Sequence, residues 1–225
     1  MTLVWSPETA SKAYIDTVQT CGITSKTSAA EFLSAMAAGY NAKLIVEAWT
    51  LHENGDVSNI ITSTGLAIAA KYTHGRHVCI VPDEASRVEY FSAMQKISSE
   101  VSLPEVVVVE KEETMKEKLN KVDFLVLDGG RKDFARVLNT VKLNQHGSVL
   151  VCKRNITTLR WRDVIQDAKV SVVRAITLPF ENNGLEIAYI ASSSSYDGNL
   201  KSRKNFKRWI RHVDQKSGEE HVFWR

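Results

Sequence analysis

Hydrophobic spacing predicts two helices near the start of the chain. The first helix has a clear start signal at Ser6-Pro7-Glu8. Ser6 is a capping residue, Pro7 suits a first helical turn, and Glu8 is an acid favoured by the helix dipole. Apolar residues then recur at helical spacing as far as Cys21. Ser28-Ala29-Ala30-Glu31 is a capping box, and apolar residues spaced for a second helix follow it up to Tyr40. We therefore expect two helices before the first strand.

From residue 43 onward, short continuous apolar runs alternate with helical segments. Continuous Val, Ile and Leu runs are typical of strands buried on both faces, as in a parallel sheet covered by helices. Five β-α units therefore predict a doubly wound sheet with right-handed crossovers. The strands are expected near 44–46, 77–81, 106–109, 124–127 and 149–152, with helices at 62–73, 84–99, about 112–120, 131–142 and 158–168.

The alternation ends after residue 170. Two apolar stretches, 170–178 and 185–191, flank a turn-rich segment that leaves no room for a helix. If these two strands are neighbours, they must pair antiparallel, which gives a seven-stranded, mostly parallel sheet with an antiparallel terminal strand. The fold class is therefore α/β, with a Rossmann-like sheet.

The end of the chain predicts a separate element. The apolar residues Phe206, Trp209, Ile210 and Val213 are spaced for an amphipathic helix after a flexible connection. We therefore expect one domain over 1–198, with N-terminal helices in 1–42 and a sheet core in 43–192. A basic tail over 199–225 follows this domain.

Positive charge concentrates in this tail. Residues 200–225 carry eight Lys or Arg and three Asp or Glu, a net charge of +5, whereas the whole chain has +3. Such a tail can attract anions, RNA or membrane headgroups. The alternative explanation is that these residues form a solvated helix face. Basic residues mixed with aromatic ones in 201–211 favour RNA binding, while their apolar stripe favours packing.

Composition narrows the class of protein. With 225 residues, 44% of them hydrophobic, the chain is long enough for one large α/β domain. Its uncharged apolar stretches are far shorter than the roughly 18 residues of a membrane span, and the first residues do not form a signal peptide. Cys21, Cys79 and Cys152 are odd in number and lack a CxxC spacing, which indicates a reducing compartment. We expect an intracellular protein, cytoplasmic or nuclear.

The layout of five β-α units and two closing strands resembles the class I S-adenosylmethionine (SAM)-dependent methyltransferases. The two leading helices resemble the small O-methyltransferase branch, which includes the caffeoyl-CoA enzymes. GLEIAYIASS and RWIRHVDQKSGEEHVFWR are similar to segments of a plant family of unknown function placed in that superfamily. The resemblance implies a SAM-binding fold, but fold alone is weak evidence for activity.

The loop after the first strand departs from the pattern of these methyltransferases. The family has a glycine-rich G-x-G-x-G turn there, whereas EAWTLHENGDVSNIITSTG contains only Gly55 and Gly65. This absence argues against ordinary SAM binding. Glu47 matches the acid that opens the family motif, and it is equally explained as a cap of the next helix. The resemblance extends the predicted cofactor contacts to Trp49 and Gly65.

The loop after the second strand supplies two further acids. In the family, an acid there binds the ribose hydroxyls of SAM, and Asp83 and Glu84 are the candidates, shifted by Pro82. Both are equally explained as the N-terminal cap of the helix at 84–99.

VDFLVLDGGRKDF, at 122–134, resembles the fourth-strand segment of the O-methyltransferases. The family Asp there binds a divalent cation that holds a catechol, and Asp128 matches it. Hard cations need several oxygen ligands, and Lys153 and Arg154 stand where the family has an Asp-Asn pair. The sequence therefore predicts no metal site.

Asp128 is still the best candidate for a catalytic or SAM-orienting residue. It stands at the carboxyl end of a buried strand, where ligands bind in open α/β sheets, and Gly129 beside it is a further predicted cofactor contact. A cap for the helix at 131–142 explains Asp128 equally well.

Two functional hypotheses follow. The first is a methyltransferase-like protein that binds SAM through a remodelled loop, with an unknown methyl acceptor. The second is a non-catalytic binding or scaffold protein that has lost the cofactor and whose basic tail contacts a protein or RNA. No phosphate-binding loop or nucleophile elbow supports an ATPase or a hydrolase.

Overall fold

The computed structural model divides the chain into two compact units, Met1–Ser192 and Ser193–Arg225. The structure describes residues 5–23, 29–50, 58–97, 101–109, 118–129, 131, 133–153, 161, 165, 170–179, 184–192, 209–213 and 220–224.

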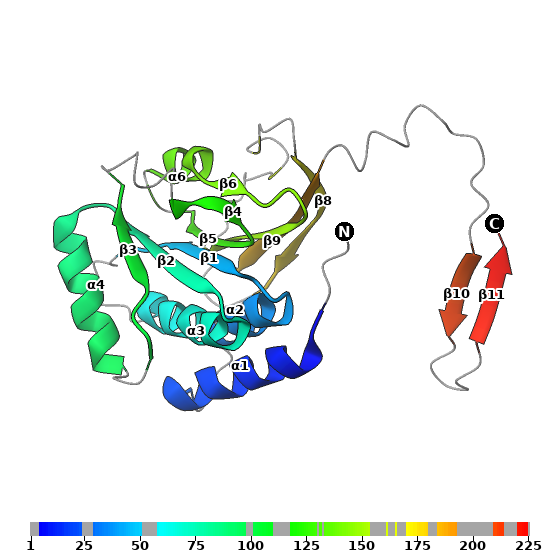
Figure 1. Cartoon of the computed structure of the whole chain (residues 1–225), viewed down its shortest axis with the longest axis horizontal. Helices are drawn as coiled ribbons and strands as arrows, with labels where there is room; N and C mark the ends of the chain where they lie inside the picture. The colour runs from blue at the N-terminus through cyan, green and yellow to red at the C-terminus, as the bar shows by residue number, and fades with distance from the viewer. Residues whose placement is uncertain are drawn as a thin grey trace. The chain divides into compact units, whose positions relative to one another are not determined.

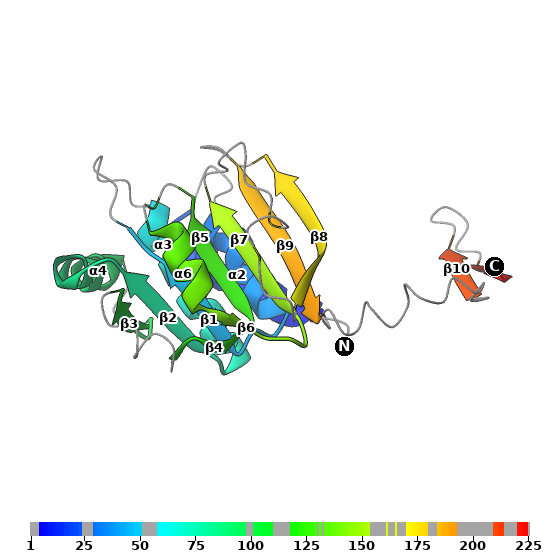
Figure 2. The same ribbon diagram turned by 90° about the horizontal axis from the view of Figure 1, so that it is seen from above.

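The first unit is built on a seven-stranded sheet with the strand order β3-β2-β1-β5-β7-β9-β8 (Figure 1). Parallel pairing joins β3, β2, β1, β5 and β7, whereas β9 runs antiparallel to both of its neighbours. This order places β3 and β8 at opposite edges of the sheet (Figure 2). This arrangement confirms the fold class predicted from the hydrophobic pattern. The strands are β1 (Leu44–Ala48), β2 (Arg76–Val81), β3 (Glu105–Val108), β5 (Phe124–Asp128), β7 (Ser148–Lys153), β8 (Val170–Leu178) and β9 (Leu185–Ser192).

Helices cover both faces of this sheet (Figure 1). One face packs against a helical layer in which Ala13, Leu33 and Leu66 join the core beneath Ile45 and Phe124. On the other face, the short helix α6 contributes Val137 and Leu138 to a second core cluster. The helices are α1 (Pro7–Thr20), α2 (Ala29–Gly39), α3 (Ser58–Thr73), α4 (Glu84–Ile97) and α6 (Phe134–Thr140).

The strand at the centre of the sheet shows why the hydrophobic pattern predicted the fold. All five residues of β5 are buried, because β1 and β7 pair with its two edges and helices cover both of its faces. The register places Asp128 opposite Lys153. The carboxyl ends of β5 and β7 therefore meet at one edge of the sheet.

A small parallel sheet of β4 (Asn120–Val122) and β6 (Lys142–Leu143) was not predicted. The helix expected over 131–142 is shorter than the pattern suggested, because the chain becomes extended at Val141 and enters β6. The helices expected near 112–120 and 158–168 lie mostly outside the described residues.

The second unit contains β10 (Trp209–Val213) and β11 (Glu220–Trp224), which pair antiparallel with Trp209 opposite Trp224. The amphipathic helix predicted through 209–213 is therefore wrong. Trp, Ile and Val favour strands, and a partner strand satisfies the backbone in a way that helical spacing alone cannot reveal. The basic segment 201–208 lies outside the described residues, so RNA binding stays a prediction.

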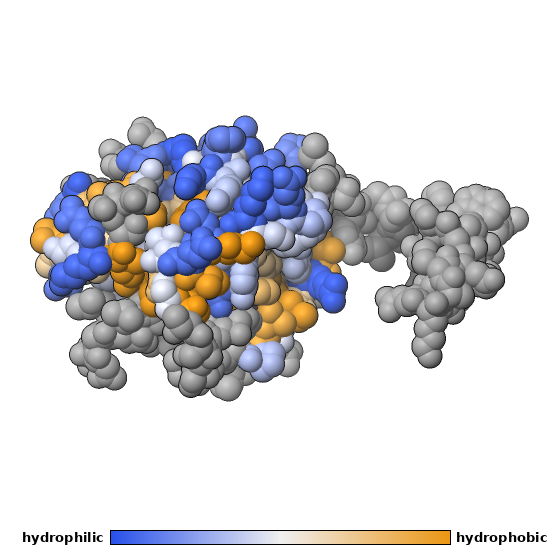
Figure 3. All heavy atoms as spheres, turned by 90° about the horizontal axis from the view of Figure 1, so that it is seen from below, coloured by the Kyte–Doolittle hydropathy of each residue, from blue (hydrophilic) through white to orange (hydrophobic). Residues whose placement is uncertain are grey.

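Among the described residues, large exposed apolar side chains lie on several separate elements. Figure 3 shows the face that carries the N-terminal helices, where apolar and hydrophilic areas alternate. The most exposed large apolar residues are Ile15 in α1 and Val88 in α4, on separate helices. No helix in the described part of the chain has both the length and the hydrophobicity to cross a membrane.

Candidate functional site

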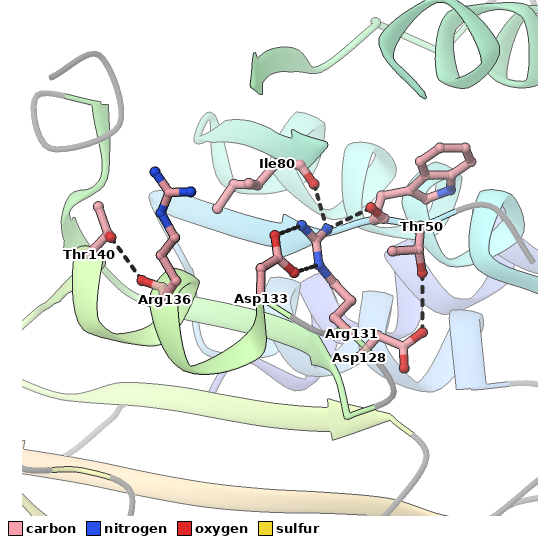
Figure 4. Close-up of polar contacts among 8 residues, drawn as sticks. Thr50, Ile80, Asp128, Arg131, Asp133, Arg136 and Thr140 are labelled. Carbon is pink, nitrogen blue, oxygen red and sulfur yellow. Dashed lines mark hydrogen bonds and ion pairs between the residues drawn. The ribbon is translucent and has the colours of Figure 1, made fainter. Parts of the chain in front are cut away.

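The predicted site residues around Asp128 lie where the parallel strands end. Asp128 is the last residue of β5 and is only 1% exposed. Thr50, two residues beyond the end of β1, donates a long hydrogen bond from Oγ1 to Asp128 Oδ2 at 3.5 Å (Figure 4). Helix α6 begins later, at Phe134, and Asp133 is its N-cap residue. Asp128 therefore does not cap that helix.

A second set of polar contacts joins the neighbouring elements to this edge. Lys153, at the end of β7, donates from Nζ to Asn59 Oδ1 at 2.7 Å. Asn59, in the first turn of α3, donates from Nδ2 to the carbonyl oxygen of Thr50 at 2.9 Å. We call Thr50, Asn59, Asp128 and Lys153 the strand-end group. Sequence reasoning used Lys153 only as an argument against a metal and missed Thr50 and Asn59, for which no local pattern gives a signal.

The Arg131 side chain makes four hydrogen bonds at this edge (Figure 4). Its Nη1 donates to the carbonyl oxygens of Trp49 at 2.6 Å and Ile80 at 3.1 Å. Its Nε and Nη2 bind the two carboxylate oxygens of Asp133 at 2.6 and 2.5 Å. We call Arg131, Asp133 and these two carbonyl groups the Arg131 latch. Sequence reasoning missed it; the signal in the sequence was an arginine three residues after the end of β5.

Glu47 belongs to a different environment, which we call the buried cluster: Glu47, His77, Tyr90 and Ser63. Tyr90 Oη donates to Glu47 Oε1 at 3.1 Å, and His77 Nε2 lies 3.2 Å from the same oxygen. Burial by itself raises the pKa of Glu47, but His77 and Ser63 outweigh that effect and lower the pKa below its usual value. Glu47 therefore makes its hydrogen bond within the buried cluster, and the charge of Lys153 in the strand-end group also lowers its pKa.

Two other predicted cofactor contacts also lie within packed layers. The Trp49 ring is buried edge-to-face against Tyr90, with ring centroids 5.2 Å apart. Its indole N–H has no hydrogen-bond partner among the described residues. Gly65 lies inside α3, where an added Cβ would come within 2.9 Å of the carbonyl oxygen of Ala30. Gly65 therefore permits close helix packing and is not part of a glycine-rich turn.

Asp83 and Glu84 lie at the start of α4, and both are exposed. The backbone N–H of Ser86 donates to Asp83 Oδ1 at 2.7 Å, and this bond lowers the pKa of Asp83. Asp83 thus makes the capping contact that was the alternative to ribose binding. Gly129 remains at the site edge, where its N–H donates to the carbonyl oxygen of Lys153. Gly55 and Arg154 lie outside the described residues.

The family assignment comes from the whole sequence. The family described as protein of unknown function (DUF1442) matches residues 1–225. The chain belongs to the DUF1442 family. No curated protein matches it by sequence.

Solved structures show the fold of this DUF1442 chain. The O-methyltransferase from Bacillus cereus, in complex with S-adenosylhomocysteine (SAH), is 16% identical with a TM-score of 0.53, over 80% of this chain and 90% of that chain. A Staphylococcus aureus protein assigned as a caffeoyl-CoA O-methyltransferase is 12% identical with a TM-score of 0.51, over 79% and 90%. These similarities confirm the predicted methyltransferase-like, Rossmann-like fold. The predicted plant origin stays a prediction.

The strand-end group of this DUF1442 chain consists of polar and charged side chains. Among the described residues, no three His, Cys, Asp or Glu side chains gather in a way that could hold a metal ion. Burial, assisted by the Asp128 carboxylate, raises the pKa of Cys152 to about 12. The Cys152 thiol therefore stays protonated at neutral pH and is a poor nucleophile. The strand-end group brings together a carboxylate, an ammonium group, an amide and a hydroxyl.

Proposed function

We propose that this DUF1442 chain is a methyltransferase-like protein that binds SAM, or a related adenosyl amino acid, at the strand-end group. One observation carries the proposal: the buried Asp128 carboxylate lies in register with Lys153 at the ends of neighbouring strands. Ligands of open α/β sheets bind outside the carboxyl ends of such strands.

The strand-end group matches the charges of an amino acid. Register partners in a parallel sheet project to the same face, so Asp128 and Lys153 lie on the side where α3 begins. The Asp128 carboxylate suits the ammonium group of the methionyl part. Lys153 and the amino end of α3 suit its carboxylate, since a helix N-terminus favours negative charge.

Methyl transfer requires little beyond this positioning. The acceptor's lone pair attacks the methyl carbon in line with the leaving sulfur, so the new bond forms as the carbon–sulfur bond breaks and SAM becomes SAH. A base removes the acceptor's proton. Asp128 is the candidate for that base or for orienting the cofactor. The proposal does not specify the methyl acceptor.

A second candidate function is a non-catalytic binding protein. The Arg131 latch favours it, because a buried guanidinium holds the main-chain carbonyl that follows β1. A protein of this kind would bind the amino-acid part of a ligand without transferring a methyl group. Transfer of labelled methyl from SAM to a cell extract separates the two functions.

Calorimetric titration of the purified full chain with SAM and with SAH tests the proposal. We expect micromolar binding that Asp128→Asn and Lys153→Met each weaken by about tenfold or more, equivalent to about 1.4 kcal/mol. Lys142→Met, which changes an exposed lysine in β6, is the matched control and should bind as the wild type does. Absence of binding at millimolar ligand by a folded sample would refute the proposal.

A further inference from the structure

The Arg131 latch joins the ends of β1 and β2. Its position therefore affects how large a ligand bound at Asp128 can be. β1 stands between β5 and β2 in the sheet, so any molecule extending from Asp128 to the end of β2 must pass the end of β1. Arg131 binds the carbonyl oxygen of Trp49, which directly follows β1, and that of Ile80 in β2. The guanidinium therefore lies on this route, between the carbonyl that follows β1 and a carbonyl near the end of β2; Figure 4 shows both contacts.

The latch is held firmly. A guanidinium has five N–H donors, and four of those of Arg131 are used in the contacts to Trp49, Ile80 and Asp133. The side chain is 1% exposed, so these charge-assisted bonds form away from water. Burial opposes ionisation of Asp133, but Arg131 lowers the pKa of this carboxyl below its usual value. The pair therefore stays charged at neutral pH.

The sheet itself does not depend on the latch. The Ile80 carbonyl already accepts a hydrogen bond from the backbone N–H of Trp49 at 2.9 Å, which continues the pairing of β1 with β2. Withdrawal of Arg131 would leave the Trp49 carbonyl as an acceptor at the end of β1. A donor on a ligand, such as an amino group, could then take the place of the guanidinium.

We propose that the Arg131 latch determines which ligand this chain accepts. An amino-acid-sized zwitterion binds the strand-end group while the latch is closed. The nucleoside part of an adenosyl ligand binds only when Arg131 withdraws from the ends of β1 and β2. This inference rests on the proposed function, and it adds that wild-type affinity for adenosyl ligands is held down by the latch.

The expected size of the effect follows from the fraction of open molecules. If the latch is open in about one molecule in thirty, the observed Kd for an adenosyl ligand is about thirty times weaker than that of the open form. A variant without the latch should recover that factor. A ligand that does not extend past β1 should be unaffected.

Titration of three probes, SAH, L-methionine and adenosine, into the full chain tests the latch. Arg131→Met should bind SAH about tenfold or more tighter than the wild type. It should also bind adenosine when the wild type does not, and L-methionine should bind both forms equally. Asp133→Asn, which keeps the size of the side chain, should move SAH affinity in the same direction. Arg136→Met, an exposed arginine in α6, is the control.

The outcomes separate the latch from the proposed function. Equal SAH affinity in wild type and Arg131→Met, with Asp128→Asn still weakening it, would refute the latch and leave the function standing. Weaker SAH binding by a folded Arg131→Met would make Arg131 a ligand contact and would also refute the latch. If no probe binds any folded form, both proposals fail. Circular dichroism of each variant establishes folding, and Asp133→Asn decides the matter if Arg131→Met does not fold.

Discussion

Glu47 and Asp128 are carboxylates on adjacent strands and are almost equally buried, at 2% and 1% exposure. Their partners differ. Glu47 contacts His77 in β2 and Tyr90 in α4, so residues of regular elements enclose it. Asp128 contacts Thr50, which lies beyond a strand end. Burial alone therefore does not identify a ligand site; the position of the partner residues distinguishes a carboxylate enclosed by regular elements from one at the strand ends, where ligands of open α/β sheets bind.

The largest effect that this comparison predicts is on stability at Glu47. Glu47→Ala removes the acceptor of the Tyr90 hydroxyl and the charge beside His77, and it should lower the free energy of unfolding by about 3–5 kcal/mol. Asp128→Asn keeps its shape and should lower it by about 1–2 kcal/mol. Urea denaturation followed by circular dichroism measures both values.

Ligand binding tests whether Glu47, unlike Asp128, lies outside the ligand site. Glu47→Gln preserves the side-chain volume and should leave the SAH affinity of the folded protein unchanged. A tenfold loss of affinity in folded Glu47→Gln would mean that Glu47, like Asp128, contacts the ligand.

The next effect concerns pH and follows from the lowered pKa of Glu47. A carboxyl whose folded pKa lies below its unfolded value of about 4.3 stabilises the fold above that value. The contribution is lost as the pH falls through the folded pKa. The stability difference between wild type and Glu47→Gln should therefore be constant from pH 7 to about pH 5 and shrink at lower pH. Urea midpoints at several pH values measure it, and a difference that grows on acidification would contradict the assignment.

The fold could be predicted from sequence because its central strands are buried on both faces. The run Phe124 to Leu127 has no polar alternation, and that pattern is typical of a parallel sheet. The hairpin of β10 and β11 could not be predicted in this way, because the apolar spacing of Trp209, Ile210 and Val213 fits a helix until the pairing with β11 is known. Pairing with β11 therefore determines that this segment is a strand and not a helix.

The candidate site was only partly predictable for a related reason. Strand assignment places Asp128 and Glu47 near strand ends, but it does not say which face or which partners each side chain meets. The Arg131 side chain contacts a carbonyl in β2, 51 residues earlier in the chain. Gly65 was a predicted cofactor contact of the loop after β1, but it lies inside α3, in line with the helix expected over 62–73. Contacts of this range are set by topology, which no local pattern encodes.

The smallest predicted effect is at Asp83, which follows β2 but is exposed and caps α4. Asp83→Ala removes the acceptor of the Ser86 N–H and should lower Tm by about 2–4 °C, whereas the neighbouring Glu84→Ala should change Tm by much less. Asp83→Asn keeps a good capping residue and should preserve both Tm and SAH affinity. A tenfold loss of SAH affinity in Asp83→Asn, with Tm unchanged, would instead mean that Asp83 contacts the ligand. In that case an exposed acid at a strand end would belong with Asp128, and the capping bond to Ser86 would be a second use of the same carboxylate.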